Sequence, residues 1–497
     1  MKKSFFFYDL ETSGISSRND RIMQFAGVRT NMDLEPMGEP VNFLVKLGKD
    51  CLPNVGALLV TGISPQETAQ DGLTELEACR LLQNEVFTEG TCAVGFNNVR
   101  FDNEFLRFLF WRNFFPAYEW QFREGRSTWD ILDMVRMVRA LRPEGIQWPV
   151  TDDGKATNRL ELLTKLNGID HFAAHDALSD VYATIAVARL IREKQPQMFD
   201  YLLKMRDKKE VANLVISGKP FVYTSGRYAE EFNKTTVVYA FNKNSADAAV
   251  WDLRYSVRDF LELSDLDLKN RIFVWNDEAV REQVRNGEIA KLPVKKLKYN
   301  KCPAVAPLGV LSSGDGWNKI GLSEEIVAKH LEELRAAPEF LQRVVNILAE
   351  KPEYVGASDG VSAPRVAEDK LYDGGFPSRE DEQRMLEVRS LDASLARKWS
   401  EDSATAPKFS DERLDEMLPR FLARNFYEKM SSTAAAKWDE WCRERVDFVK
   451  VGFEKDLMEA MAKNADLADV SDDAVKLQKR NGFILEDARL WCESLYL

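Results

Sequence analysis

Two carboxylates end a short apolar segment near the N-terminus. Residues 5–8 read Phe-Phe-Phe-Tyr, and Asp9 and Glu11 follow, two positions apart. If this segment is a β-strand, its period of two residues puts both carboxylates on the same face. Like charges at the end of a buried strand are costly unless a cation neutralises them, so a metal ion is the natural partner. Taken alone, an Asp-x-Glu pattern is better explained as a solvated strand end.

A third carboxylate follows a second predicted strand. Residues 93–102 read Ala-Val-Gly-Phe-Asn-Asn-Val-Arg-Phe-Asp, so the strand runs into a loop, and Asp102 stands directly before a helical stretch at 103–112. The ordinary role of an aspartate at this position is to cap the helix N-terminus. Asp102 alone therefore indicates little about chemistry.

A histidine and a fourth carboxylate form the pattern H-x-A-x-x-D at His175 and Asp180. On one continuous helix these two side chains would be about 140° apart. We therefore predict that His175 lies in the loop before a helix and that Asp180 lies on its first turns. His171 completes an H-x-x-x-H pair, but the glutamate of a zinc protease motif is missing between the two histidines, which argues against zinc.

Four carboxylates and one imidazole suit the hydrolysis of a phosphodiester. The reaction needs an activated water, compensation for charge on phosphorus and stabilisation of the leaving oxygen. Two Mg²⁺ ions about 3.5 to 4 Å apart supply all three, and Mg²⁺ prefers carboxylate oxygen and water as ligands. An imidazole with an ordinary pKa of about 6.5 can take the proton from that water.

The segment 101–126 interleaves aromatic and basic residues. Proteins that bind single-stranded nucleic acid stack its bases on aromatic rings and contact its phosphates with basic residues such as arginine. Phe101, Phe105 and Phe108 have helical spacing and are better explained as core. Beyond Pro116, Tyr118 and Phe122 are the better stacking candidates, and Arg107 is a candidate phosphate contact.

The elements that position these residues predict an α/β domain. Short apolar strands at 5–10, 22–28, 41–45 and 92–96 alternate with helical stretches at 76–86, 103–112, 159–166 and 177–192. After a basic helical connector at 204–209, short strands at 221–224, 236–241, 249–254 and 271–275 suggest a small barrel or sandwich. Helical periodicity dominates from residue 323 onward, and a stretch rich in Asp, Gly and Pro at 351–377 is predicted as a linker.

Composition sets the broad class. The chain has 497 residues, 45% of them hydrophobic and 30% charged, which suggests about three domains of ordinary globular type. No apolar run approaches the roughly 20 residues that span a bilayer, and Asp9 and Glu11 interrupt the apolar N-terminus too early for an export signal. Six scattered cysteines fit a reducing cytoplasm. The net charge of -12 counts against nucleic-acid binding, although a groove needs only a local basic stripe.

The three motifs, in this order and in these contexts, resemble those of the DEDDh family of 3′ to 5′ exonucleases. With the small β-rich and helical parts that follow, the chain is similar to the bacterial exonuclease I branch of that family. The resemblance implies a ribonuclease H-like α/β exonuclease domain at 1–195, a small SH3-like β domain with flanking helices at 196–350 and an α-helical C-terminal domain at 351–497. It also implies that Asp9 bridges two Mg²⁺ ions, for which Mn²⁺ can substitute. Glu11 and Asp180 would hold one ion, Asp102 would act on the other, and His175 would be the general base.

The same resemblance implies processive, Mg²⁺-dependent removal of 5′-mononucleotides from the 3′ end of single-stranded DNA, in DNA repair and recombination, by a monomeric cytoplasmic enzyme. Glu11 would also contact substrate, and Arg159 would contact its phosphate, although a solvent-facing arginine is as good an explanation. The acidic C-terminal tail of single-stranded DNA-binding protein is an implied partner, with Arg142, Tyr201, Lys204 and Arg206 as unranked contacts. The basic run at 291–301 fits either a DNA channel or a solvated strand edge. Two alternatives stay open: a 3′ to 5′ exoribonuclease of the same superfamily, and a catalytically silent nucleic-acid-binding scaffold.

Overall fold

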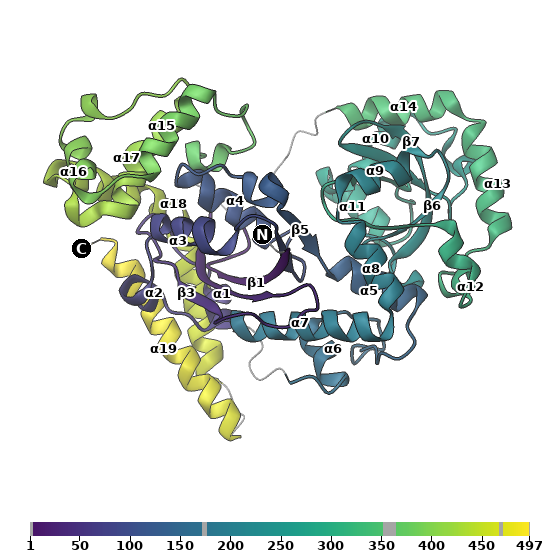
Figure 1. Ribbon diagram of the computed structural model, residues 1–497, viewed down its shortest axis with the longest axis horizontal. Helices are drawn as coiled ribbons and strands as arrows, with labels where there is room; N and C mark the ends of the chain where they lie inside the picture. Colours follow the sequence, from purple (N-terminus) through teal and green to yellow (C-terminus); the bar gives the residue numbers. More distant parts are fainter. Residues whose placement is uncertain (1–2, 171–175, 351–363, 467–470, 497) are drawn as a thin grey trace. The chain divides into compact units, whose positions relative to one another are not determined.

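The chain folds into two compact units in the computed structural model, which describes residues 3–170, 176–350, 364–466 and 471–496 (Figure 1). The first unit holds the described residues within 1–128, 171–185 and 358–497, and the second holds those within 129–170 and 186–357. The four carboxylates of interest all belong to the first unit.

A five-stranded mixed sheet forms the centre of the first unit. Its strands are β1 (Ser4–Thr12), β2 (Ile22–Thr30), β3 (Val41–Leu44), β4 (Thr91–Gly95) and β5 (Ser127–Asp130), in the order β3-β2-β1-β4-β5. β1 is antiparallel to β2 and parallel to β4. Phe5, Phe6 and Phe7 are all buried, because both faces of this central strand are covered, and a continuous apolar run is what such a strand requires.

Helices lie on both sides of β1. The helices of the first unit are α1 (Val55–Thr61), α2 (Pro65–Asp71), α3 (Glu75–Leu81), α4 (Asp102–Arg112), α15 (Arg379–Arg389), α16 (Ala393–Glu401), α17 (Glu412–Phe426), α18 (Ser432–Ala465), α19 (Asp472–Ser494) and the first half of α7 (Ala177–Lys194). α4 and the first half of α7 lie on opposite sides of β1 (Figure 1). Phe6 and Tyr8 belong to one core with Phe105 of α4 and Phe421 of α17, so the C-terminal helices complete the core beside this sheet.

The second unit contains a five-stranded antiparallel sheet. Its strands are β6 (Phe221–Thr224), β7 (Thr235–Lys243), β8 (Asp247–Asp252), β9 (Val294–Lys298) and β10 (Ala304–Pro307), in the order β10-β6-β7-β8-β9. Its helices are the second half of α7, α5 (Leu132–Leu141), α6 (Leu160–Leu166), α8 (Pro196–Lys204), α9 (Lys208–Ile216), α10 (Asp265–Ile272), α11 (Glu278–Arg285), α12 (Gly316–Lys319), α13 (Glu324–Arg335) and α14 (Pro338–Ala349). The predicted small β-rich fold is confirmed for this part.

Two local predictions are wrong. The strand predicted at 271–275 is the end of α10 followed by a 3₁₀ turn, Val274–Asn276. The apolar run suggested a strand, but Ser264 accepts a hydrogen bond from Asp267 N at 3.1 Å and starts a helix there. The predicted linker at 351–377 is not a simple spacer over its described residues, because Ala367, Glu368 and Leu371 are buried in the first unit. No helix in the described part of the chain is both long and apolar enough to cross a membrane.

Candidate active site

Three carboxylates converge at the end of β1. Asp9, Glu11 and Asp180 each offer an oxygen, and these atoms all lie within 4.8 Å of one another. β1 holds Asp9 opposite Ala26 and Glu11 opposite Gln24, so the two acids share one face of the strand, as their spacing predicts. Asp180 comes from the first turn of α7. The structure therefore brings together two motifs that are far apart in the sequence.

Asp102 joins the cluster from α4. It is the first residue of the helix and is buried, while Phe101 occupies the N-cap position without a side-chain cap hydrogen bond. The ordinary capping role therefore does not account for this aspartate. Its charge raises the pKa of both Asp9 and Glu11. The charges of the other three carboxylates therefore all act on Asp9.

The cluster is electrostatically unfavourable without a cation. Burial, followed by the charges of Asp102, Glu11 and Asp180, raises the pKa of Asp9 well above its ordinary value. Burial and the charges of Asp180 and Asp102 raise the pKa of Glu11 to about 8. Perturbed groups of this kind gather at functional sites, and a bound cation would restore the ionised forms.

The donor set fits a hard divalent cation. All the converging ligand atoms are carboxylate oxygens, which Mg²⁺ and Mn²⁺ prefer, and no thiol takes part in the cluster that the described residues form. The charges of the other three acids all act on Asp9. A divalent metal site is therefore the chemistry that these residues support.

The start of α7 is fixed by Asp176. Its Oδ2 accepts a hydrogen bond from Ser179 N at 3.0 Å, and its carbonyl accepts one from Asp180 N, also at 3.0 Å. Asp180 therefore lies on the first turn, as predicted. His175, the predicted general base, and His171 lie outside the described residues. Asp176 also adds negative charge near Glu11, a contribution that the sequence analysis missed.

The predicted substrate contacts differ in their surroundings. Arg159 is exposed directly before α6 in the second unit. Arg107 is buried, with Nη1 2.5 Å from Glu104 Oε1 and Nη2 2.7 Å from Gln121 Oε1. Its guanidinium is already engaged by protein groups, so a phosphate would have to compete with them. The substrate roles of both arginines stay predictions.

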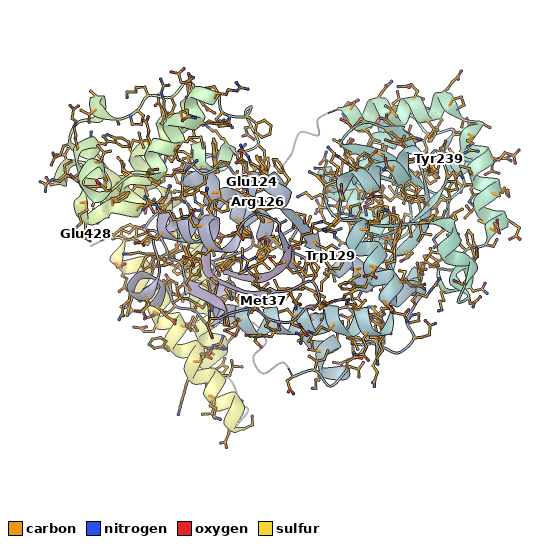
Figure 2. The ribbon with its side chains drawn as sticks, viewed as in Figure 1. Met37, Glu124, Arg126, Trp129, Tyr239 and Glu428 are labelled. Atoms are coloured by element: carbon orange, nitrogen blue, oxygen red, sulfur yellow. The ribbon has the colours of Figure 1, made fainter. Side chains whose placement is uncertain are left out.

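The aromatic segment contributes to both core and surface, and Phe101 and Tyr118 are partly buried against the core. Phe105 and Phe108 are buried in the core, whereas Phe122 is 65% exposed. Among the arginines after α4, Arg123 pairs with Glu119. Arg126 and Glu124 are labelled in Figure 2, and Arg126 Nη2 lies 2.8 Å from Glu124 Oε2. Arg112 is buried and pairs with Glu75 at 2.6 Å, so it has a structural role.

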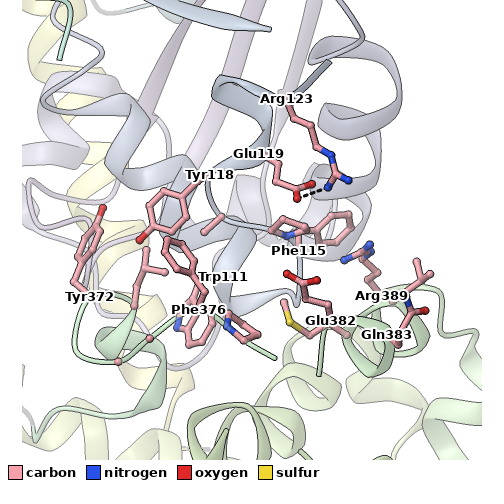
Figure 3. A pocket seen from close by; sticks show the side chains of 18 of the residues that line it. Trp111, Phe115, Tyr118, Glu119, Arg123, Tyr372, Phe376, Glu382, Gln383 and Arg389 are labelled. Carbon is pink, nitrogen blue, oxygen red and sulfur yellow. Dashed lines mark hydrogen bonds and ion pairs between the residues drawn. The ribbon is translucent and has the colours of Figure 1, made fainter. Parts of the chain in front are cut away.

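Tyr118 and Phe122 line an apolar cavity of about 480 Å³ inside the first unit (Figure 3). The opposite wall comes from Tyr372 and Phe376, in the segment predicted as a linker. The rings of Tyr118 and Phe376 are 5.8 Å apart in an edge arrangement, and Phe376 is 85% exposed. The sequence analysis missed this wall, although two aromatic residues in a stretch rich in Gly and Pro were a signal.

The basic run at 291–301 includes β9, the edge strand of the second sheet. Lys296 and Lys298 are exposed on one face of that strand, and Lys296 pairs with Asp247 at 3.0 Å. The Lys295 side chain instead packs on an aromatic ring, with its Nζ 4.4 Å from the centre of the Tyr223 ring. Both the edge-protecting and the DNA-binding explanations remain compatible with the exposed lysines.

Three family models match consecutive parts of the chain. They describe an exonuclease (residues 6–188), an exonuclease I SH3-like domain (206–350) and an exonuclease I C-terminal domain (366–495). The predicted fold class, with an α/β exonuclease domain, an SH3-like domain and a helical C-terminal domain, is confirmed by these matches.

Curated relatives and solved structures agree with the family models. Exodeoxyribonuclease I of Haemophilus influenzae is 37% identical over 468 residues, which cover 93% of this chain and 95% of the relative. The Escherichia coli exodeoxyribonuclease I is 36% identical, over 89% and 90% of the two chains. Among structures, E. coli exonuclease I in complex with a dA16 oligonucleotide matches with a TM-score of 0.87, 33% identity and coverage of 99% of this chain and all of the other. A moderately thermophilic exonuclease I from Methylocaldum szegediense matches with a TM-score of 0.85, 34% identity and 99% coverage of both chains.

Proposed function

The chain belongs to the exonuclease I family and is a DNA exonuclease, and from this premise we propose that it hydrolyses single-stranded DNA from the 3′ end with the help of Mg²⁺. The observation that carries the proposal is the convergence of Asp9, Glu11 and Asp180 within 4.8 Å, with the charge of Asp102 acting on the same group. The relatives' names support DNA as the substrate. A relative's complex with a dA16 oligonucleotide supports the proposal that this DNA is single-stranded.

Each carboxylate has a proposed role. Asp9 would hold two divalent ions, Glu11 and Asp180 would share one of them, and Asp102 would act on the other. When bound, the ions would activate water and offset charge on the phosphate oxygens. Mn²⁺ can substitute, because it accepts the same oxygen ligands.

His175 would take the proton from the attacking water, because imidazole is a base near neutral pH. His175→Ala tests this role. We expect turnover in Mg²⁺ to fall by roughly 10²- to 10⁴-fold, the usual contribution of general base catalysis. Near-normal turnover would show that another group accepts the proton.

The activity is tested with labelled single-stranded DNA in Mg²⁺ and in EDTA. We expect loss of substrate only in Mg²⁺, abolished by Asp9→Ala. Oligonucleotides blocked at the 3′ or the 5′ end, with a duplex control, test direction and strandedness. DNA left intact in every condition would favour the alternative of a silent nucleic-acid-binding scaffold.

The exoribonuclease alternative is tested with DNA and RNA oligonucleotides of one sequence. A site built for DNA need not accept the 2′-hydroxyl that distinguishes RNA. We expect DNA to be degraded faster, releasing 5′-mononucleotides. Faster loss of RNA would assign the chain to RNA processing instead.

We also propose that Glu11, Arg107, Arg159, Tyr118 and Phe122 contact the substrate. The exposure of Phe122 and Arg159 supports their availability to DNA. We also propose the domain boundaries 1–195, 196–350 and 351–497. Limited proteolysis with mass spectrometry tests those boundaries.

The proposed partner is the acidic C-terminal tail of single-stranded DNA-binding protein, within a role in DNA repair and recombination. Arg142, Tyr201, Lys204 and Arg206 are the proposed contacts. Arg142 Nη2 donates to Val310 O at 2.8 Å, and burial raises the pKa of Tyr201 to about 12, so it stays neutral. Polarisation of a labelled acidic tail peptide, with Lys204→Glu as the charge reversal, tests the contact.

We further propose that the protein is a processive cytoplasmic monomer. Its six cysteines are free and buried, which suits a reducing compartment. Sedimentation of the purified chain tests the monomer, and a trap of unlabelled DNA added during hydrolysis tests processivity.

A further inference from the structure

A buried hydrogen-bond network lies behind the carboxylate cluster. The Tyr8 hydroxyl donates to Asn103 Oδ1, and Asn98 Nδ2 donates to the Tyr8 oxygen at 3.3 Å. The Asn103 backbone N–H closes the loop by donating to Asn98 O at 2.8 Å. Tyr8 is 2% exposed, and both asparagines are 0% exposed, so bulk water does not compete for these bonds.

Each end of the network adjoins a carboxylate. Tyr8 directly precedes Asp9 on β1 but points to the opposite face, toward α4. Asn103 directly follows Asp102 at the start of α4. The bond between Tyr8 and Asn103 therefore ties the strand that bears Asp9 to the helix that bears Asp102.

Aromatic rings pack against the ring of Tyr8. Its ring stacks on Phe25 at 5.8 Å and meets the edge of Phe87 at 6.1 Å. A phenylalanine would suit this core without the cost of burying a hydroxyl. Buried polar side chains that are hydrogen-bonded to each other favour one arrangement of the strand and the helix that they join.

The conformation of the loop before α4 also places the Asn98 side chain in this network. Asn97 has a positive φ of 75°, and a Cβ added to Gly95 would lie 2.6 Å from Asn98 Cβ. Only glycine leaves room for the Asn98 side chain to fold back under the loop. Asn98 Oδ1 finds no hydrogen-bond partner among the described residues, so this placement is kept despite an unsatisfied buried acceptor.

We propose that Tyr8 and Asn103 are positioning residues that set the placement of Asp102 relative to Asp9, and with it the divalent-ion affinity of the site. The inference rests on the proposed function, because it assumes that these carboxylates hold metal ions. Both residues are buried, and in this role they act through the backbone of their neighbours Asp9 and Asp102.

Tyr8→Phe tests the proposal because it removes one oxygen atom and keeps the ring. The direct measurement is calorimetric titration of the full-length protein with Mn²⁺ in the absence of DNA. We expect the affinity for Mn²⁺ to fall by about 2- to 12-fold, the net worth of one hydrogen bond. The half-saturating Mg²⁺ concentration for hydrolysis should rise by the same factor.

Tyr427→Phe is the matched control. It removes a phenol hydrogen bond of 2.7 Å to Asp439 elsewhere in the first unit. It should shift the melting temperature without changing the affinity for Mn²⁺. Equal Mn²⁺ affinities for Tyr8→Phe, Tyr427→Phe and the parent chain would overturn the positioning role while leaving the proposed function intact. A parent chain that bound no divalent ion would overturn both.

Asn103→Ala and the double variant complete the test. The double variant combines Tyr8→Phe with Asn103→Ala. If the two side chains act as one unit, its affinity for Mn²⁺ should be no lower than that of the single variant with the lower affinity. Losses that add would show independent effects and overturn the joint role. If Asn103→Ala does not fold, the comparison of Tyr8→Phe with its control decides the proposal.

Discussion

Arg424 and Glu368 form a buried ion pair, with Arg424 Nη2 2.8 Å from Glu368 Oε1. Arg420 binds the same carboxylate at 2.6 Å, and Arg424 Nε reaches Asp50, in the loop after β3, at 3.1 Å. Helix α17 is thus tied to Glu368 before α15 and to the loop that follows β3. The integrity of the active-site unit depends on charges contributed by the C-terminal region.

Glu368→Gln should destabilise the first unit. Burial would raise the pKa of Glu368, but the Arg424 and Arg420 guanidinium groups outweigh it and lower this pKa to about 2. Since the folded pKa lies below the unfolded value of about 4.3, the stabilisation is fully present above pH 4.3 and is lost as the pH falls toward 2. Removing one partner of a buried pair costs about 3 to 5 kcal/mol. Thermal unfolding is measured at pH 7 and pH 3. The melting temperature of Glu368→Gln should lie below that of the parent chain at pH 7, and the difference should be smaller at pH 3. Glu486→Gln, in an exposed pair, is the control and should have little effect at either pH.

Glu11→Gln should stabilise the metal-free protein. Burial, Asp180 and Asp102 raise the pKa of Glu11 to about 8, so the folded state keeps a proton that the unfolded state loses near pH 4.3. This group therefore makes the protein less stable as the pH rises from about 4.3 to 8. In EDTA the melting temperature of Glu11→Gln should exceed that of the parent chain, by about 2 to 4 °C per kcal/mol recovered. The difference should be larger at pH 8.5 than at pH 5.5, and saturating Mg²⁺ should reduce or reverse it. A lower melting temperature in EDTA at pH 8.5 would contradict the electrostatic account.

Asp180→Asn should nearly abolish hydrolysis. Loss of a ligand from the proposed metal site would remove several kcal/mol of charge stabilisation, which corresponds to a decrease in kcat of roughly a thousand-fold. Asp200→Asn on α8, an exposed position, is the control and should retain normal kcat. Similar rates for both variants would remove Asp180 from the metal site.

Tyr118→Ala and Phe122→Ala should weaken the binding of single-stranded DNA. A stacked base is worth about 1 to 3 kcal/mol, so the dissociation constant should rise by about 5- to 150-fold, whereas kcat at saturating DNA should change little. Binding is measured by fluorescence polarisation in Ca²⁺ or EDTA, where hydrolysis is blocked. Phe483→Ala, an exposed aromatic on α19, is the control. Unchanged affinity in both cavity variants would show that the cavity takes no base.

Local pattern was enough to predict most elements that carry the site. The period of two in β1 placed Asp9 and Glu11 on one face, and the helical periodicity after residue 177 placed Asp180 on a first turn. The prediction failed at 271–275, where the apolar run suggested a strand. The helix that begins after the N-cap Ser264 continues into this run instead. It also failed at 364–377, where composition suggested a linker but burial against α17 orders the segment.

The sequence by itself determined the residue types of the site, their order and the faces on which β1 presents them, because these depend on contacts between near neighbours along the chain. Only the tertiary structure decided that Asp180 converges with Asp9, that the charge of Asp102 acts on Asp9, and that Tyr8 is hydrogen-bonded to Asn103. It also decided that Tyr372 and Phe376 form the second wall of the aromatic cavity. These relationships join residues that are distant in sequence. They are fixed by the packing of α4, α7 and the C-terminal helices around one sheet, and periodicity along the chain carries no information about that packing.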